Sequence, residues 1–192
     1  MQEERIIMLN GKQRQAAQSC LWIWEALVKL LQEQDYQTIK VADICQEAGL
    51  SRRTFYRYFD HKDDLIDYYC HNKTQDYITE CQKIDMVHTP FEEIWQRFFE
   101  FWWQERDIVR LLIEQQLFYR VSLQMTQQLS GVYTMFDAPW HLTENQEEID
   151  YIMSFSIGGL FNVLNKWLVK AQPESPEKVA RTLIHALSFD AK

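Results

Sequence analysis

The segment Thr38–Leu65, TIKVADICQEAGLSRRTFYRYFDHKDDL, carries the most informative pattern in this chain of 192 residues. Apolar residues recur at steps of three and four over Val41–Ala48, the spacing of one face of a short helix. Gly49 then interrupts the pattern and can adopt the left-handed conformation that ends many helices. Ser51 is a favourable N-cap for a further helix that runs to Phe59. The segment therefore predicts two short helices joined by a tight turn.

The second of these helices separates its aromatic side chains from its basic ones. Because each helical residue advances by about 100°, Phe55 and Phe59 fall on one side. Arg52, Arg53 and Tyr56 fall on the other side. A helix-turn-helix unit needs this arrangement, because its second helix enters the major groove of DNA while its apolar side packs on the supporting helices. A solvated basic surface without a partner is the alternative interpretation.

The sequence around this unit resembles the TetR family of bacterial transcription regulators, over about residues 13–65. The resemblance rests on four pieces in order: Val41-Ala42-Asp43-Ile44, Gly49-Leu50, the run Thr54–Phe59, and Lys62. Each piece alone is common, but their combination over some fifty residues is specific. The resemblance implies an N-terminal DNA-binding domain and a C-terminal domain for ligand binding and dimerisation.

The resemblance also implies two kinds of DNA contact. The residues that face base edges are Arg52, Arg53 and Tyr56. The residues that contact phosphates are Lys40, Thr54, Tyr58 and Lys62. Two of these positions depart from the family pattern. Lys40 stands where Ser or Thr is usual, so it offers charge but loses a hydroxyl cap. Tyr58 stands where many members have His.

The remainder of the chain has helical periodicity and no convincing alternating strand, which predicts an all-α fold of about nine helices. Long helices are expected over residues 13–34, 60–83 and 144–170, and Ser130–Thr143 is expected to be a loop. Asp60 is the expected N-cap of the helix over 60–83. We place a helix-turn-helix DNA-binding domain at residues 1–62 and a ligand-binding and dimerisation domain at residues 63–192.

Composition and motifs limit the class of protein. The net charge is -8, but residues 1–60 hold 8 basic and 8 acidic side chains, so an acidic average does not exclude nucleic acid. The four cysteines form no zinc-binding or disulfide pattern, and no signal peptide or membrane span is expected, which favours a cytoplasmic protein. The sequence contains no HExxH, GxSxG or Gly-rich phosphate loop. We therefore expect no enzyme activity, metal or cofactor.

The C-terminal part is rich in aromatic residues, which cluster in Phe91–Trp103. Such a helix is apolar around so much of its circumference that it must be buried on more than one side. Ordinary core packing is one interpretation, and a pocket for a small apolar or aromatic ligand is the other. The candidate pocket residues are Trp95, Phe99, Trp102, Phe118, Tyr119, Phe136, Trp140 and Phe155.

A pair of glycines, Gly158 and Gly159, lies inside the expected helix over residues 144–170. Each glycine costs roughly 1 kcal/mol of helix propensity, so close approach of another helix should offset the cost. The family pairs its last two helices with those of a second subunit. The candidate dimer interface is Gly158, Gly159, Val179, Leu183 and Leu187, and packing within one chain is the alternative.

Together these patterns predict a homodimeric regulator that binds double-stranded DNA at a palindromic operator and is controlled by a small ligand. Repression is the expected outcome of binding. A ligand-independent activator with the same fold, or a helical interaction protein without DNA binding, is the alternative.

Overall fold

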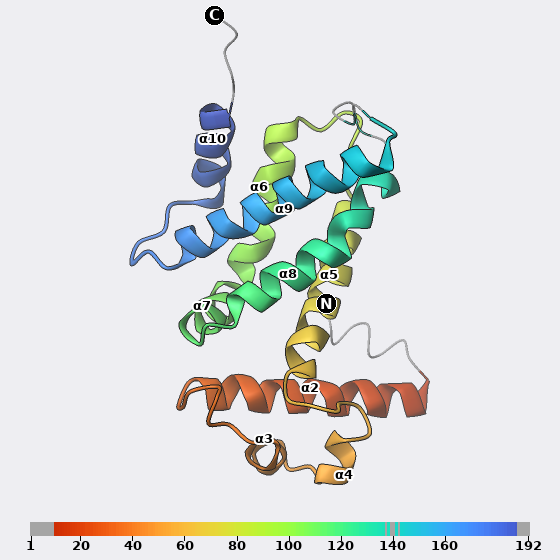
Figure 1. The fold of residues 1–192 in the computed structure, drawn as a ribbon, viewed down its shortest axis with the longest axis vertical. Coiled ribbons are helices and arrows are strands. Elements are labelled where there is room, and N and C mark those ends of the chain that lie inside the picture. Colours follow the sequence, from red (N-terminus) through yellow and green to blue (C-terminus); the bar gives the residue numbers. More distant parts are fainter. Residues whose placement is uncertain (1–9, 137, 139–140, 142, 188–192) are drawn as a thin grey trace, which may run out of the picture. The chain divides into compact units, whose positions relative to one another are not determined.

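The computed structural model describes residues 10–136, 138, 141 and 143–187. Over these residues the chain forms nine α-helices, one 3-10 helix and no strand (Figure 1), which confirms the predicted all-α fold. The chain divides into two compact units, one up to Asp76 and one from Tyr77 on. The division falls within helix α5 (Asp64–Cys81). The functional boundary after residue 62 stays a prediction.

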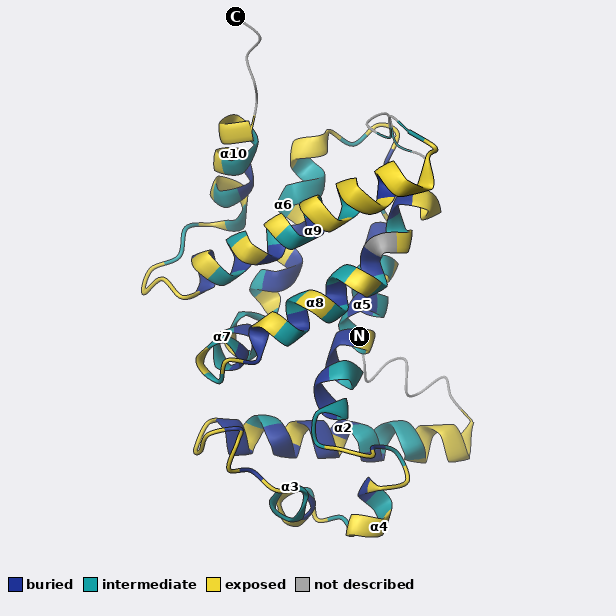
Figure 2. Cartoon of the chain, in the orientation of Figure 1, coloured by how far each residue is buried: buried dark blue, intermediate teal, exposed yellow. Residues whose placement is uncertain are grey.

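The N-terminal unit contains α2 (Gly11–Leu31), α3 (Val41–Glu47), α4 (Arg52–Phe55) and the first part of α5. Its core is built from one face of each helix, as Figure 2 shows for α2. Within this core Trp24 stacks on Tyr69 with ring centroids 4.8 Å apart. Ile44 of α3 and Phe55 of α4 are buried in the same core, which holds two short helices that have too few residues to be stable by themselves.

The beginning of α5 differs from the sequence prediction. Asp60 was expected to cap this helix, but regular helix begins at Asp64. The Asp64 carboxylate accepts hydrogen bonds from the backbone N–H groups of Asp60 at 2.7 Å and His61 at 2.9 Å. The carboxylate therefore reaches back to satisfy donors that precede the helix, a geometry that residue spacing alone does not distinguish from an Asp60 cap.

The C-terminal unit contains the remainder of α5 and five further α-helices. These are α6 (Phe91–Gln104), α7 (Arg106–Glu114), α8 (Phe118–Leu129), α9 (Gln146–Leu168) and α10 (Pro176–Leu187). In this unit α8 packs beside α9 and α10 packs beside α6 (Figure 1). The first part of the predicted loop is helical, because Ser130–Met135 forms a 3-10 helix, η1, directly after α8.

Aromatic rings fill the centre of the C-terminal unit. The fully buried Phe161 on α9 contacts the rings of Phe98, Trp102 and Phe118, with centroid distances of 5.8, 5.3 and 6.1 Å. Near the C-terminal end of α9, the Arg110 guanidinium donates a 2.8 Å hydrogen bond to the carbonyl of Leu168. A cation at the C-terminus of a helix complements its dipole, so α7 and α9 are joined by charge as well as by packing.

Candidate DNA-binding surface and ligand cavity

The turn between α3 and α4 has the geometry that its sequence predicts. Gly49 has φ 63°, a left-handed conformation that suits glycine. The N–H of Leu50 donates to the carbonyl of Cys45 at 2.9 Å, which closes the end of α3. Ser51 caps α4, because its hydroxyl accepts the N–H of Thr54 at 3.1 Å. The turn therefore fixes the direction of α4 against α3.

Helix α4 and the turn after it separate buried rings from exposed cations. Phe55 is fully buried and packs on Phe59, whereas Tyr56 is 55% exposed. Arg52 and Arg53 are exposed on the first turn. Regular helix ends at Phe55, not at Phe59 as the sequence predicted, and residues 56–58 continue as turns. The inward and outward sides are nevertheless those that the sequence pattern predicts.

Three of the expected phosphate contacts lie at or near the surface of this unit. Lys40 lies immediately before α3 and is exposed. Its backbone N–H donates a 2.8 Å hydrogen bond to the Asp43 carboxylate. Asp43 therefore satisfies the donor of a residue that cannot cap α3 with its own side chain. Thr54 and Tyr58 are half-buried, and the Thr54 hydroxyl lies 3.0 Å from that of Ser51.

The fourth expected phosphate contact, Lys62, is held by the protein itself. Its ammonium donates to the carbonyls of Tyr36 at 2.5 Å and Ile39 at 2.9 Å, and it lies 4.2 Å from the centre of the Tyr36 ring. The Tyr36 hydroxyl in turn donates to the Asp63 carboxylate. Lys62 therefore ties the segment before α3 to the start of α5, a structural role that the sequence analysis did not predict.

Replacing Lys62 by methionine is expected to lower the free energy of unfolding of the N-terminal unit by about 1.5–3 kcal/mol, the usual contribution of hydrogen bonds to a charged group. Lys40→Met is the matched control, because that ammonium is exposed and its loss should leave stability nearly unchanged. Amide hydrogen exchange in α2 and α3 measures the difference. Equal protection in the two variants would contradict the structural role of Lys62.

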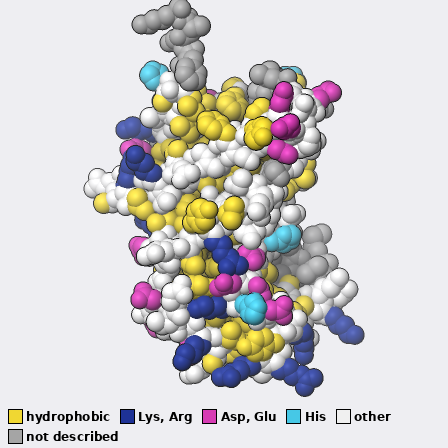
Figure 3. Space-filling view, viewed as in Figure 1, with side chains coloured by type: hydrophobic (Ala, Val, Ile, Leu, Met, Phe, Trp, Pro, Cys, Tyr) yellow, Lys and Arg dark blue, Asp and Glu magenta, His cyan; other side chains and the backbone are white. Residues whose placement is uncertain are grey.

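A groove beside α4 could not be predicted from the sequence pattern. Residues of α2 between Gly11 and Trp22, including Arg14, line it together with Thr54, Arg57 and Tyr58. Trp22 is 47% exposed, which is high for such a large apolar ring. No sequence motif distinguishes Arg14 or Trp22, because the groove exists only once α2 and α4 have packed together. In Figure 3, Lys and Arg side chains gather at the edge of the unit where Figure 1 places α3 and α4.

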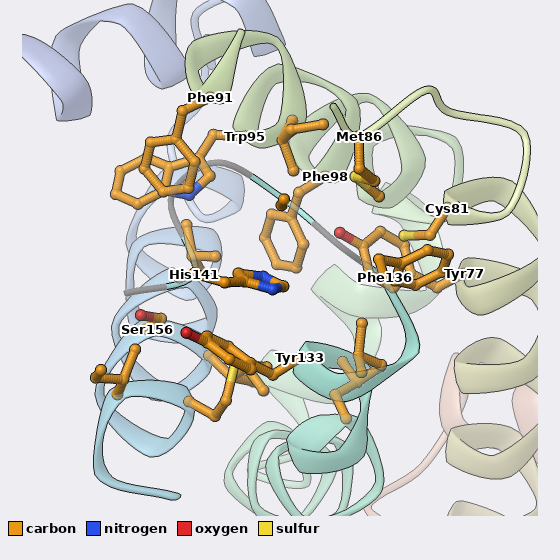
Figure 4. A pocket seen from close by; sticks show the side chains of 18 residues that line it. Tyr77, Cys81, Met86, Phe91, Trp95, Phe98, Tyr133, Phe136, His141 and Ser156 are labelled. Carbon is orange, nitrogen blue, oxygen red and sulfur yellow. The ribbon is translucent and has the colours of Figure 1, made fainter. Parts of the chain in front are cut away.

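The C-terminal unit contains a largely apolar cavity of about 260 Å³. The end of α5, α6, α8, η1 and α9 all contribute side chains to it, as Figure 4 shows. Two of the predicted pocket residues, Trp95 and Phe136, line this cavity. Among the described residues that line it, none carries a carboxylate, an ammonium or a guanidinium.

The other predicted pocket residues lie elsewhere. Phe99, Trp102 and Phe118 are buried in the aromatic core and do not line the cavity. Tyr119 and Phe155 are 79% and 76% exposed. Trp140 lies outside the described residues. Helical periodicity identifies apolar sides, but it does not distinguish a side that faces a void from one that faces other rings or solvent.

The polar groups of the cavity are few and lie in two places. On one wall, His141 stacks on Tyr133 with centroids 3.8 Å apart, and the Ser156 hydroxyl belongs to the same lining. On another wall, Tyr77 lies beside Cys81 (Figure 4). Burial raises the pKa of the Cys81 thiol to about 11 and that of Tyr77 well above its ordinary value. Both groups are therefore protonated at neutral pH, and the cavity offers donors without negative charge.

The predicted interface residues on α9 and α10 differ in how closely other parts of the chain pack on them. A Cβ atom added at Gly158 or Gly159 would meet nothing within 4 Å, so no part of the described chain packs closely on this pair. Val179 and Leu183 are half-buried in a groove between α9 and α10, and Leu187 is exposed. The interface assignment stays a prediction, but close intrachain packing does not explain the glycines.

Two classes of site are not found within the described part of the chain. No cluster of three or more His, Cys, Asp or Glu side chains is placed to hold a metal ion. No helix there is both long enough and apolar enough to cross a bilayer.

Comparison with known proteins assigns the two units to one family. Residues 23–69 match the family model described as bacterial regulatory proteins, tetR family, and residues 90–188 match one described as transcriptional regulator C-terminal region. No curated protein matches the chain significantly. The fold is similar to the crystal structure of a TetR transcriptional regulator from Streptococcus agalactiae 2603V, with a TM-score of 0.61, 21% identity, and 91% and 96% of the two chains covered. Because the two family models together span both the helix-turn-helix unit and the helical unit, the chain belongs to the TetR family of bacterial transcription regulators.

Proposed function

We propose that this regulator recognises a palindromic operator as a homodimer and that a small, neutral, largely apolar ligand controls its affinity for DNA. The proposed DNA recognition rests on three exposed side chains, those of Arg52, Arg53 and Tyr56. A short helix supports these side chains, and the opposite side of that helix is anchored by the fully buried Phe55. The basic side is therefore free to enter a groove without disturbing the core.

The chemistry of these side chains suits base recognition. Arginine presents two parallel donors that match the O6 and N7 acceptors of guanine in the major groove. The phosphate contacts proposed for Lys40, Thr54, Tyr58 and Lys62 would set the register of the helix on the duplex. In a homodimer two such surfaces are related by a two-fold axis, so they require a DNA site with the same symmetry. The two half-sites would lie about one helical turn apart.

The expected signature of this binding is a strong dependence on salt. Each phosphate that a lysine or arginine neutralises releases counterions, so the logarithm of affinity falls linearly with the logarithm of salt concentration. Fluorescence anisotropy with a labelled operator duplex at 50 to 300 mM salt measures the slope. A slope near zero would contradict the proposed phosphate contacts and would favour the helical interaction protein.

The lining of the cavity supports the ligand part of the proposal. A charged ligand would lose its hydration there without an opposite charge among the described lining residues, which is costly. A cavity of about 150 Å³ already accommodates benzene, so 260 Å³ suits one ring with a short substituent. The hydroxyl of Ser156 and the imidazole of His141 would bind a single polar group of that ligand.

Filling the cavity tests this part separately from DNA binding. Ser156→Phe is expected to weaken ligand binding by at least tenfold, because a ring would occupy the space that a ligand needs. DNA affinity without ligand should change less than threefold. A compound screen read by tryptophan fluorescence, since Trp95 lines the cavity, supplies the ligand.

Gln104→Phe is the control, because it adds the same ring at an exposed position on α6. Compounds that bind both proteins equally would place the ligand outside the cavity. Compounds that bind the unmodified protein without changing its DNA affinity would remove ligand control from the proposal. A ligand switches the regulator only if it binds the DNA-free and DNA-bound arrangements unequally.

A further inference from the structure

Two side chains that line the cavity of the C-terminal unit carry hydrogen-bond donors without an acceptor. They are the indole N–H of Trp95 on α6 and the hydroxyl of Ser156 on α9. Among the described residues, none accepts a hydrogen bond from either group. A ligand that fills the cavity displaces water from these donors, and a donor that loses water without a new partner weakens binding. The ligand must therefore supply an acceptor or bind at a cost.

Other polar groups of the same lining already have partners. Tyr77 and Cys81 are hydrogen-bonded to each other, and the Tyr133 hydroxyl donates to the carbonyl of Thr143 at 3.4 Å. The His141 imidazole, which stacks on Tyr133, can donate or accept according to its tautomer. His141 therefore does not select between kinds of ligand. The capacity that the lining leaves unused is the capacity to donate.

The two donors belong to the same end of the cavity. Figure 4 shows Trp95 and Ser156 on the side away from the residues of α5. The rings of Phe98 on α6 and Phe161 on α9 pack 5.8 Å apart, and ring contacts between these helices continue toward both C-terminal ends. Trp95 and Ser156 both precede this contact by about one helical turn. They thus lie on the two walls at the same level of the unit.

We infer that the cavity takes an aromatic molecule with a carbonyl group, whose oxygen accepts hydrogen bonds from Trp95 and Ser156. This inference rests on the proposed ligand site and specifies the chemistry of its ligand. A carbonyl oxygen has two lone pairs, so one atom can accept both bonds. The group is uncharged, which suits a lining without a carboxylate, an ammonium or a guanidinium among its described residues.

Other ligand classes fit these donors less well. An indole N–H can only donate, so a ligand whose polar group also only donates would leave Trp95 unpaired. A hydrocarbon would leave both donors unpaired. A carboxylate would accept both bonds, but it would bring a charge into an apolar cavity whose described lining holds no cation. A carbonyl is the neutral group that accepts two bonds and brings no donor of its own.

Two small molecules of the same shape test the inference. Acetophenone carries a C=O group where α-methylstyrene carries C=CH2, so they differ in the acceptor alone. The ratio of their affinities is compared between variants, because the different costs of removing the two molecules from water then cancel. Ser156→Ala and Trp95→Phe are each expected to lower the relative preference for acetophenone by about fivefold, the effect of one lost hydrogen bond. Ligand-observed NMR measures both affinities.

Matched controls remove the same groups outside the cavity. Ser154→Ala deletes an exposed hydroxyl of α9, and Trp103→Phe replaces an indole that stacks on Trp167. Both variants should keep the wild-type ratio. Ser156→Thr retains the hydroxyl, so it should also keep the ratio, even if its extra methyl group weakens the binding of both compounds.

Each other outcome is decisive. A ratio that is unchanged in Ser156→Ala and in Trp95→Phe would overturn the inference and leave an apolar ligand site intact. A ratio that falls in only one of the two variants would overturn the shared acceptor. Equal falls in the controls would show that the change does not come from the cavity donors, and would also overturn it. A wild-type chain that binds neither compound up to the limit of solubility would overturn the proposed ligand site itself.

Discussion

Replacing Phe55 by alanine is expected to destabilise the N-terminal unit by about 3–5 kcal/mol, the usual cost of removing a buried phenyl ring. The side chain is fully buried and contacts Phe59 at a centroid distance of 5.6 Å. Because α4 has only four residues in regular helix, it depends on this ring for its position. Specific DNA binding should therefore be lost, while the aromatic core of the C-terminal unit remains intact.

Tyr56→Ala is the matched control, because Tyr56 is the next residue and its side chain is 55% exposed. Its removal should cost little stability but change the preference for bases. Amide hydrogen exchange over residues 41–59 reports the stability of this region separately from that of the C-terminal unit. If these amides are as well protected from exchange in the Phe55→Ala variant as in the Tyr56→Ala variant, the Phe55 ring does not hold α4 in place.

Replacing Arg52 or Arg53 by alanine is expected to remove about 1–3 kcal/mol of discrimination at particular positions of the operator, if the guanidinium makes a bidentate contact with guanine. Both side chains are exposed, so their loss should leave the fold unchanged. The preference should relax at one or two positions in each half-site and remain at the others. Competition between the operator and duplexes with single base changes measures this pattern.

Lys40→Ala provides the comparison for these arginines. A lysine–phosphate contact does not depend on the base sequence. Loss of the lysine should therefore weaken binding to all duplexes alike and reduce the slope of log affinity against log salt concentration by about one. A uniform loss from Arg52→Ala and Arg53→Ala, indistinguishable from that of Lys40→Ala, would contradict the assignment of base contacts.

The helix-turn-helix unit follows from its sequence because its determinants are local. Gly49 supplies the left-handed turn, Ser51 supplies the cap, and helical spacing decides that Phe55 is buried while Tyr56 is exposed. The role of Lys62 was not predictable in this way. Its two carbonyl acceptors lie more than twenty residues earlier in the chain, and only tertiary packing brings them to the ammonium.

The cavity was harder to predict for the same physical reason. The aromatic run in α6 indicates burial, but whether a ring faces a void or another ring depends on helices far away in sequence. Phe99 and Trp102 pack into the core, whereas Trp95, on the same helix, lines the cavity. The glycine pair in α9 predicts close approach of another helix. No part of the described chain packs on it, so its assignment to a dimer interface stays a prediction.

Selection of bound sequences from a random pool of DNA duplexes measures whether this regulator recognises a palindromic operator as a dimer. We expect an enriched palindrome whose half-sites lie about one helical turn apart or slightly more, bound by two chains. The same selection with Arg53→Ala should yield a motif that has lost information at a defined position in each half-site. A pool that shows no enriched motif at low salt, or one without two-fold symmetry, would contradict recognition by a dimer through the α4 surface.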